Sequence, residues 1–150
     1  MFDAVRENAG KQGMSFEIIE HTADTGIRVR APDLPSLLSE AMRGMFTLIT
    51  DPDQVDAVRT HTIHSEGIDE TDLVINTMRE TVYRFSAENW LLKDFVVDSM
   101  NDLKVTGRIR GETLDVRKHP IRYEIKAVTY AGGEIRKTRD GLEITVIFDV

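Results

Sequence analysis

Two acidic positions far apart in the chain could together bind a metal ion. Asp149 is the penultimate residue, so its side chain lies one residue from the Val150 carboxylate. Two neighbouring carboxylates repel each other, and calcium or magnesium, which prefer oxygen ligands, would relieve that repulsion. Asp24 lies in the polar segment EHTADTG at 20–26, between two apolar stretches, and could supply a further oxygen. The simpler alternative is that Asp24 closes an Asx turn and Asp149 is a solvated strand end.

Lys126 and the histidines are the other ionisable candidates. Lys126 lies in EIKAVTY, where alternation places it opposite Ile125 and Ala127, and an exposed strand lysine is the ordinary outcome of that pattern. The segment AGGE at 131–134 is too short for a phosphate-binding loop and predicts a turn. The four histidines show neither the spacing of zinc ligands nor an evident nucleophile partner: His21, His61, His64 and His119.

The elements that must position these residues follow from the hydrophobic pattern. Alternation of apolar and polar residues predicts strands over 15–20 and 26–31. Apolar residues at three-and-four spacing predict an amphipathic helix over 34–49, which Asp33 can cap. Two further elements of the first half are a strand over 57–65 and an amphipathic helix over 70–87 with Asp69 as its cap. The later strand candidates are 91–100, 103–110, 122–130 and 142–150, the last after an Asp-Gly hairpin signal at 139–141.

This order of elements predicts one α+β domain, a sandwich of largely antiparallel sheet with two helices. At 150 residues and 41% hydrophobic composition, the chain has the size and composition of one domain with a real core. Residues 1–14 are polar and aperiodic and predict a flexible tail, and residues 15–150 predict the folded domain. No stretch resembles a secretory leader or a membrane span, and there is no cysteine, so we expect a cytoplasmic protein without disulfides or thiol chemistry.

The formal net charge of −7 is unevenly distributed. Residues 1–100 carry a net charge of −9, whereas residues 101–139 carry +5. The whole molecule should therefore repel nucleic acid. The basic stretch could meet an acidic partner or a phosphate, but a solvated face of alternating strands is the favoured interpretation.

Three motifs, taken together, resemble the archease family. They are EHTADTGIRVRA at 20–31, YEIKAVTY at 123–130 and the terminal VIFDV at 146–150, and they occur in the family's order. The resemblance spans nearly the whole chain, from Phe16 to Val150. It implies an α+β sandwich in which two helices pack against antiparallel sheets, in agreement with the order of elements above.

The resemblance also implies a function. Archeases are non-catalytic activators of the GTP- and manganese-dependent tRNA-splicing RNA ligase: they promote guanylylation of the ligase's active-site histidine and restore multiple turnover in tRNA splicing or RNA repair. The implied partner is therefore the ligase protein, with RNA contacted only through it and no membrane involved.

The resemblance further implies site residues. The family binds a divalent cation, usually calcium, with magnesium or manganese as alternatives, and its ligands match Asp24, Asp149 and Val150. The family's important lysine matches Lys126, and His21 opens the motif that contains Asp24. We expect Lys126 and His21 to serve ligase activation, although a histidine that merely closes the turn is an equal alternative for His21.

Two departures from the family and three rival functions bear on this hypothesis. Ala131 stands where family members commonly have a histidine, and the second helix is less apolar than usual, so ligase activation could be weaker here.

A metal-dependent hydrolase could use a cation on Asp24 and Asp149 to activate water, but no motif supplies a second base. A general chaperone or protein-binding module is the second rival. Direct RNA binding by residues 101–139 is the third, and the overall negative charge opposes it.

Overall fold

Two antiparallel sheets make up the outer layers of the molecule. The structure is a computed structural model that describes residues 13–20 and 24–150. One sheet has the strand order β1-β2-β8-β6, with β7 also paired to β8, and the other has the order β3-β5-β4. The strands of the first sheet are β1 (Ser15–Glu20), β2 (Thr25–Ala31), β6 (Ala127–Thr129), β7 (Arg136–Thr138) and β8 (Gly141–Asp149). Those of the second are β3 (Arg59–Glu66), β4 (Trp90–Asn101) and β5 (Lys104–Thr113).

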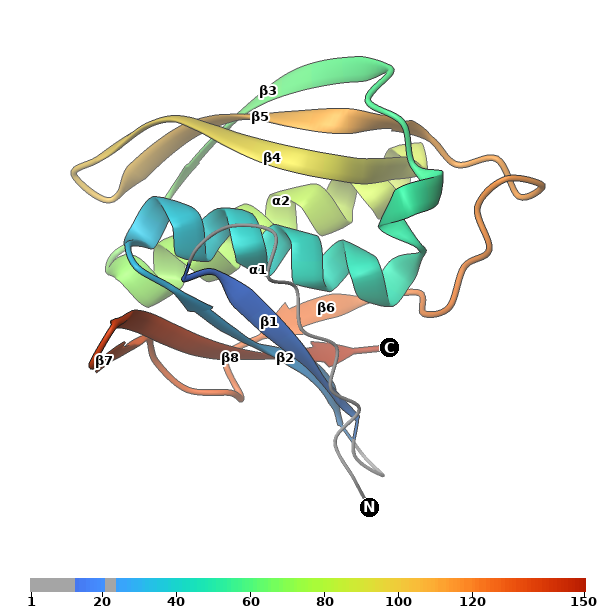
Figure 1. Ribbon diagram of the computed structural model, residues 1–150. Coiled ribbons are helices and arrows are strands. Elements are labelled where there is room, and N and C mark those ends of the chain that lie inside the picture. The colour runs from blue at the N-terminus through green and yellow to red at the C-terminus, as the bar shows by residue number, and fades with distance from the viewer. Residues whose placement is uncertain (1–12, 21–23) are drawn as a thin grey trace.

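Both helices lie between the two sheets, which confirms the predicted α+β sandwich (Figure 1). They are α1 (Leu34–Ile49) and α2 (Glu70–Glu88), and a single 3-10 turn, η1 (Pro52–Gln54), follows α1. Both predicted caps are present: Asp33 accepts a hydrogen bond from Ser36 N at 2.9 Å, and Asp69 accepts one from Asp72 N at 2.8 Å. These bonds satisfy backbone donors that the first helical turn leaves free.

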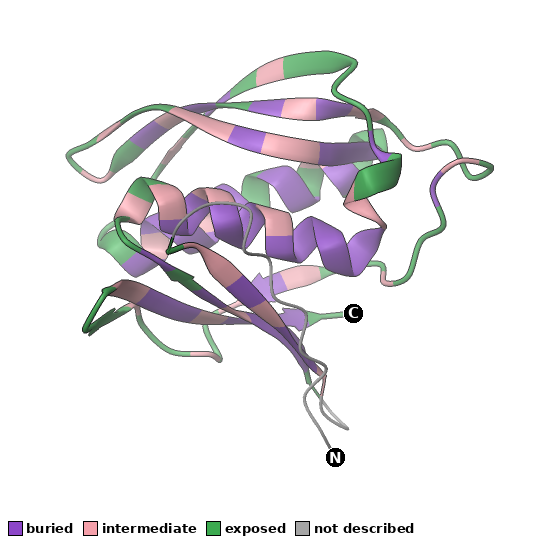
Figure 2. Ribbon diagram, viewed as in Figure 1, coloured by how far each residue is buried: buried purple, intermediate pink, exposed green. Residues whose placement is uncertain are grey.

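The burial of α1 goes beyond an amphipathic pattern (Figure 2). Every residue from Gly44 to Ile49 is buried, because α1 contacts β1, β2 and β8 on one side, β4 on the other, and α2 beside it. A helix surrounded in this way needs no polar face. The sequence predicted the extent of α1 correctly, but its amphipathic pattern did not show that the second half is buried on all sides.

The strand predicted over 122–130 is wrong in extent, because the structure keeps only β6. In register, Ala127 lies opposite Asp149, and β8 ends there, so residues before 127 have no ladder partner on that side. Among these described residues, only Lys126 N still reaches β8, at the Asp149 carbonyl, whereas Arg122 N donates to the Ile49 carbonyl at 2.8 Å.

The hairpin predicted at 139–141 is present, with β7 as the partner strand that the sequence pattern did not show. Thr138 pairs with Gly141, so the turn residues are Arg139 and Asp140. A Cβ on Gly141 would lie 2.3 Å from the Ala31 carbonyl oxygen, so the close approach of β2's end requires glycine there.

The basic stretch at 101–139 lies partly on a solvated strand face, as the favoured interpretation held. Arg108 pairs with Asp98 at 2.9 Å, and Arg110 pairs with Asp94 at 2.5 Å, both across the β4–β5 ladder. In the part of the chain that the structure describes, neither helix is long and apolar enough to cross a bilayer.

Candidate functional site

The C-terminal end of β8 brings together the segments that the sequence singled out. β8 lies between β2 and β6, and Thr25 pairs with Phe148 while Ala127 pairs with Asp149. The β2–β8 ladder ends with this Thr25–Phe148 pair, and Asp24 and Asp149 are the next residues of the two segments, so both lie at the same end of the sheet although they are far apart in the chain. Figure 1 shows the end of β8 next to the beginning of β6.

Lys126 lies at the same end of the sheet. Its backbone N–H donates to the Asp149 carbonyl at 2.8 Å, and its side chain is exposed. Asp24, Asp149 and Val150 are exposed as well. We call the group Asp24, Lys126, Asp149 and Val150 the charged tip. His21 lies outside the described residues, so its predicted role is not placed.

The chemistry of the charged tip suits a hard cation. Its donors are carboxylate oxygens, and neither Asp24 nor Asp149 has a side-chain hydrogen bond or ion pair to another described residue. Within residues 13–20 and 24–150, no group of three His, Cys, Asp or Glu side chains is arranged to hold a metal ion. Two side-chain carboxylates therefore need the Val150 carboxylate or another donor to complete a site, and the cation stays a prediction.

The segment that leads into Lys126 is anchored to two distant elements. Thr50, the C-cap of α1, donates its hydroxyl to the Pro120 carbonyl at 2.7 Å, and the Arg122 guanidinium donates to the Thr47 carbonyl at 3.1 Å. The Tyr123 hydroxyl donates to Glu20 at 2.7 Å, and this bond raises the pKa of Tyr123. Since Glu20 ends β1, this contact ties the approach to Lys126 to the β1–β2 connection.

Arg79 of α2 holds the free edge of β6. Its Nε and Nη2 atoms donate to the Val128 carbonyl at 3.1 and 3.0 Å, and its guanidinium lies 4.8 Å from the centre of the Tyr130 ring. The Tyr130 hydroxyl in turn donates to Asp72. This hydrogen bond lowers the pKa of Asp72 and raises that of Tyr130. The sequence pattern did not indicate Arg79; only the motif position of Tyr130 pointed to this region.

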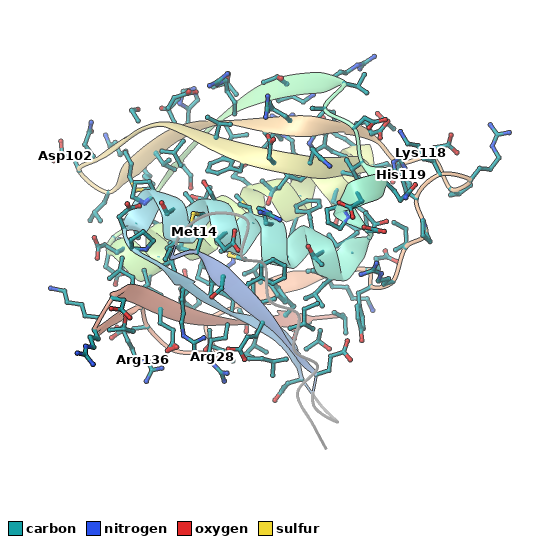
Figure 3. All side chains as sticks on the ribbon, viewed as in Figure 1. Met14, Arg28, Asp102, Lys118, His119 and Arg136 are labelled. Carbon is teal, nitrogen blue, oxygen red and sulfur yellow. The ribbon has the colours of Figure 1, made fainter. Side chains whose placement is uncertain are left out.

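A second cluster that the sequence did not reveal surrounds Glu112 (Figure 3, near Lys118 and His119). Lys118 lies 2.8 Å from Glu112 and 2.7 Å from Asp56, and His119 Nε2 lies 3.1 Å from Glu112. His119 is buried, and its Nδ1 accepts the Asp115 N–H at 2.9 Å, which leaves Nε2 to donate to Glu112. Although burial opposes ionisation, hydrogen bonds from Lys118, the Asp56 N–H and His119 lower the pKa of Glu112 to about 2.

Comparison with known proteins identifies the family. The model of the Archease protein family (MTH1598/TM1083) matches residues 16–150. The chain belongs to the archease family. The Protein archease of Methanopyrus kandleri is 38% identical over 127 residues, which cover 83% of this chain and 91% of that protein. The Protein archease of Danio rerio is 31% identical and covers 90% of this chain and 85% of its own length.

Solved structures show the same fold. The solution structure of protein 1598 from Methanobacterium thermoautotrophicum superposes with a TM-score of 0.72 at 29% identity, over 90% of this chain and 98% of that one. The crystal structure of an archease, described as a possible chaperone, from Thermotoga maritima gives a TM-score of 0.61 at 20% identity, over 88% and 94%. The archease fold expected from the three motifs is therefore confirmed.

Proposed function

We propose that this archease is a cytoplasmic, non-catalytic activator of the GTP- and manganese-dependent tRNA-splicing RNA ligase, promoting its guanylylation and multiple turnover. The observation that carries the proposal is the charged tip: Asp24, Lys126 and Asp149, from three separate motifs, lie at one end of one sheet. Family membership makes the ligase the partner to test.

In this proposal the charged tip recognises a charged surface near the ligase's active site. Asp24, Asp149 and Val150 would hold a divalent cation, calcium in the first instance with magnesium or manganese as alternatives, which would supply a concentrated positive charge. Lys126 offers a second positive charge on a flexible stem that can reach a phosphate or an acidic side chain. To activate the ligase, the archease must bind the guanylylation-competent arrangement more tightly than the resting one. A tenfold preference corresponds to about 1.4 kcal/mol.

The test is an RNA-ligation assay under multiple turnover with the ligase, with and without the archease. We expect Asp24→Asn and Lys126→Ala each to reduce the stimulation at least about tenfold, as loss of about 1.4 kcal/mol would. Asp102→Asn and Lys104→Ala are matched controls, because both residues are exposed on the β4–β5 hairpin, which lies at the opposite end of the molecule (Figure 3). Asp102 has a φ of 50°, which asparagine tolerates. Full stimulation by both tip variants would refute the assignment of the charged tip.

A general chaperone is the second candidate, favoured by the description of the Thermotoga maritima structure as a possible chaperone. Several large apolar side chains are also exposed, namely Val58, Ile68, Tyr83, Val116, Ile121, Tyr130 and Val150. A chaperone would suppress aggregation of unrelated proteins, and Asp24→Asn would not affect that activity. An activator would stimulate the ligase and would leave unchanged the heat-induced aggregation of an unrelated test protein such as citrate synthase.

A further inference from the structure

An exposed isoleucine is held rigidly at the start of α2. Ile68 is 86% exposed, yet its backbone N–H donates to Asp72 Oδ2 at 2.9 Å, and Gly67 N donates to the Leu103 carbonyl at 3.0 Å. A Cβ on Gly67 would lie 2.3 Å from Leu73 N, so this turn packs directly against the helix. Its backbone bonds therefore hold the Ile68 backbone in a position where the side chain projects into water and contributes little to folding.

Tyr130 is fixed beside this turn by the same carboxylate. Asp72 accepts the Ile68 N–H through Oδ2 and the Tyr130 hydroxyl through Oδ1. Asn76 also donates to Asp72, at 3.2 Å. Tyr130 remains 45% exposed, with Arg79 near its ring. Two apolar surfaces from distant parts of the chain are thus preorganised next to each other.

Between them lies a hollow of about 360 Å³, which we call the Ile68–Tyr130 hollow; Asp69, Asp72, Gly133 and Glu134 also line it. Every titratable group on its lining besides Tyr130 is a carboxylate. Asp72 and Asp69 are engaged in the bonds described above, whereas Glu134 is exposed and has no ion-pair partner among the residues that the structure describes. Arg79, which lies 4.8 Å from the centre of the Tyr130 ring, offsets one of the three carboxylates, so the hollow combines apolar walls with a rim that is still net negative, and Glu134 is its unpaired charge.

We propose that the Ile68–Tyr130 hollow binds an arginine or lysine side chain on the surface of the RNA ligase, a proposal that rests on the function proposed above. The charge complementarity is direct: the aliphatic stem packs between Ile68 and the Tyr130 ring, and the cationic head reaches Glu134. An acidic or purely apolar side chain would leave the rim carboxylate uncompensated.

The position of the hollow allows one partner to cover it together with the charged tip. Lys126 and Tyr130 flank β6 at its two ends, and four residues of extended chain span roughly 13 Å. An ordinary protein–protein interface covers about 800 Å² on each partner, which is wide enough for both. The hollow would add affinity for the ligase, whereas the charged tip would act at its active site.

The experiment measures the dissociation constant of the archease–ligase complex by isothermal titration calorimetry and the ligation stimulation at saturating archease. We expect Glu134→Lys and Ile68→Ser each to weaken binding about tenfold while the stimulation at saturation stays as in the wild type. Glu88→Lys makes the same charge change at the far end of α2, and Val58→Ser removes another exposed β-branched side chain; both should bind like the wild type.

The outcomes separate this inference from the proposed function. If the wild type stimulates the ligase but both hollow variants bind within twofold of it, the hollow is not a ligase contact. If Glu134→Lys and Glu88→Lys weaken binding equally, overall charge and not the hollow is responsible, which also overturns the inference. If the wild type neither binds nor stimulates the ligase, the proposed function fails and the inference fails with it.

Discussion

At the scale of single residues, Glu112 has the most strongly perturbed environment. One of its oxygens lies within hydrogen-bond distance of the Lys118 ammonium, the Asp56 N–H and His119 Nε2. Because these contacts favour the carboxylate over the carboxylic acid, its pKa falls from 4.5 to about 2. The side chain is only 15% exposed, so solvent screens these contacts incompletely. Glu112 thereby ties the end of β5 to the segment that leads toward Lys126.

A pH-dependent contribution to stability follows. The folded pKa lies below the unfolded one, so the stabilisation is fully present above about pH 4.5 and is lost as the pH falls toward 2. We expect Glu112→Gln to lower the free energy of unfolding at pH 7 by about 1–3 kcal/mol, because it removes a hydrogen-bonded charge. Between pH 5 and pH 2.5, the wild type should lose more stability than the variant, as measured by urea unfolding.

Glu124→Gln is the matched control, because Glu124 is exposed and lies in the same connection. It should leave both the stability at pH 7 and its pH dependence within experimental error of the wild type. Parallel pH profiles for the wild type and Glu112→Gln would contradict the account of Glu112.

Contacts between residues that are close along the chain could be predicted from the sequence, and contacts between residues that are far apart along the chain could not. Asp33 and Asp69 were identified as caps because a cap contacts a backbone N–H three residues on. The contact between Glu112 and Asp56 joins residues 56 apart, and no spacing rule indicates it. Asp24 and Lys126 were identified only through motifs that resemble a family.

At the scale of elements, β6 depends on its neighbours because it has only three residues. β8 holds one of its edges, and Thr129 Oγ1 adds a hydrogen bond to the Ile147 carbonyl at 2.9 Å. Arg79 holds the other edge through the Val128 carbonyl. Arg79 therefore occupies a backbone acceptor of the outer edge of β6, which makes this edge less available for pairing with another chain.

The prediction at this scale is that Arg79→Lys loosens β6. Lysine keeps the charge but cannot donate two hydrogen bonds in a fixed fork or stack in the same way on Tyr130. We expect a loss of about 1 kcal/mol in the free energy of unfolding and faster hydrogen exchange of the Val128 and Thr129 amides. Ligase stimulation should fall as well, because β6 positions Lys126.

Arg84→Lys provides the comparison on the same helix, since among the described residues the Arg84 side chain pairs with the exposed Glu88 alone, at 3.3 Å. In the Arg84→Lys variant, the β6 amides should exchange at the same rate as in the wild type. Unchanged exchange in Arg79→Lys would show that β8 alone holds the strand.

The sequence predicted the elements whose apolar residues repeat strongly, and it missed or overextended the strands whose extent is set by the neighbouring strand they pair with. The helices were found to within one or two residues because their apolar positions repeat over four or five turns. β7 has three exposed residues and exists because β8 lies beside it, so its own pattern is uninformative. For the same reason the strand expected over 122–130 shrank to the residues opposite β8.

At the scale of the whole molecule, the fold separates two ends with different character. The β4–β5 hairpin, which carries Asp102, extends from one end, and the charged tip and the Glu112 cluster lie toward the other (Figures 1 and 3). The charged tip can form because the antiparallel pairing of β2 with β8 joins the beginning of the domain to its last strand. The sequence supplied both acidic segments, but only this pairing brings them together.

The cation hypothesis therefore makes a prediction about coupling between the two segments. If Asp24 and Asp149 bind one ion, calcium should raise the unfolding temperature of the wild type by mass action, since the ion binds the folded chain only. Asp24→Asn and Asp149→Asn should each abolish most of that shift, and the double variant should lose little more than either single variant. Asp102→Asn should keep the full shift.

Additive losses would mean that the two carboxylates bind independently, and equal shifts in all variants would place the ion elsewhere. In both cases the pairing of β2 with β8 would still stand, but it would serve the sheet and not a shared metal ion.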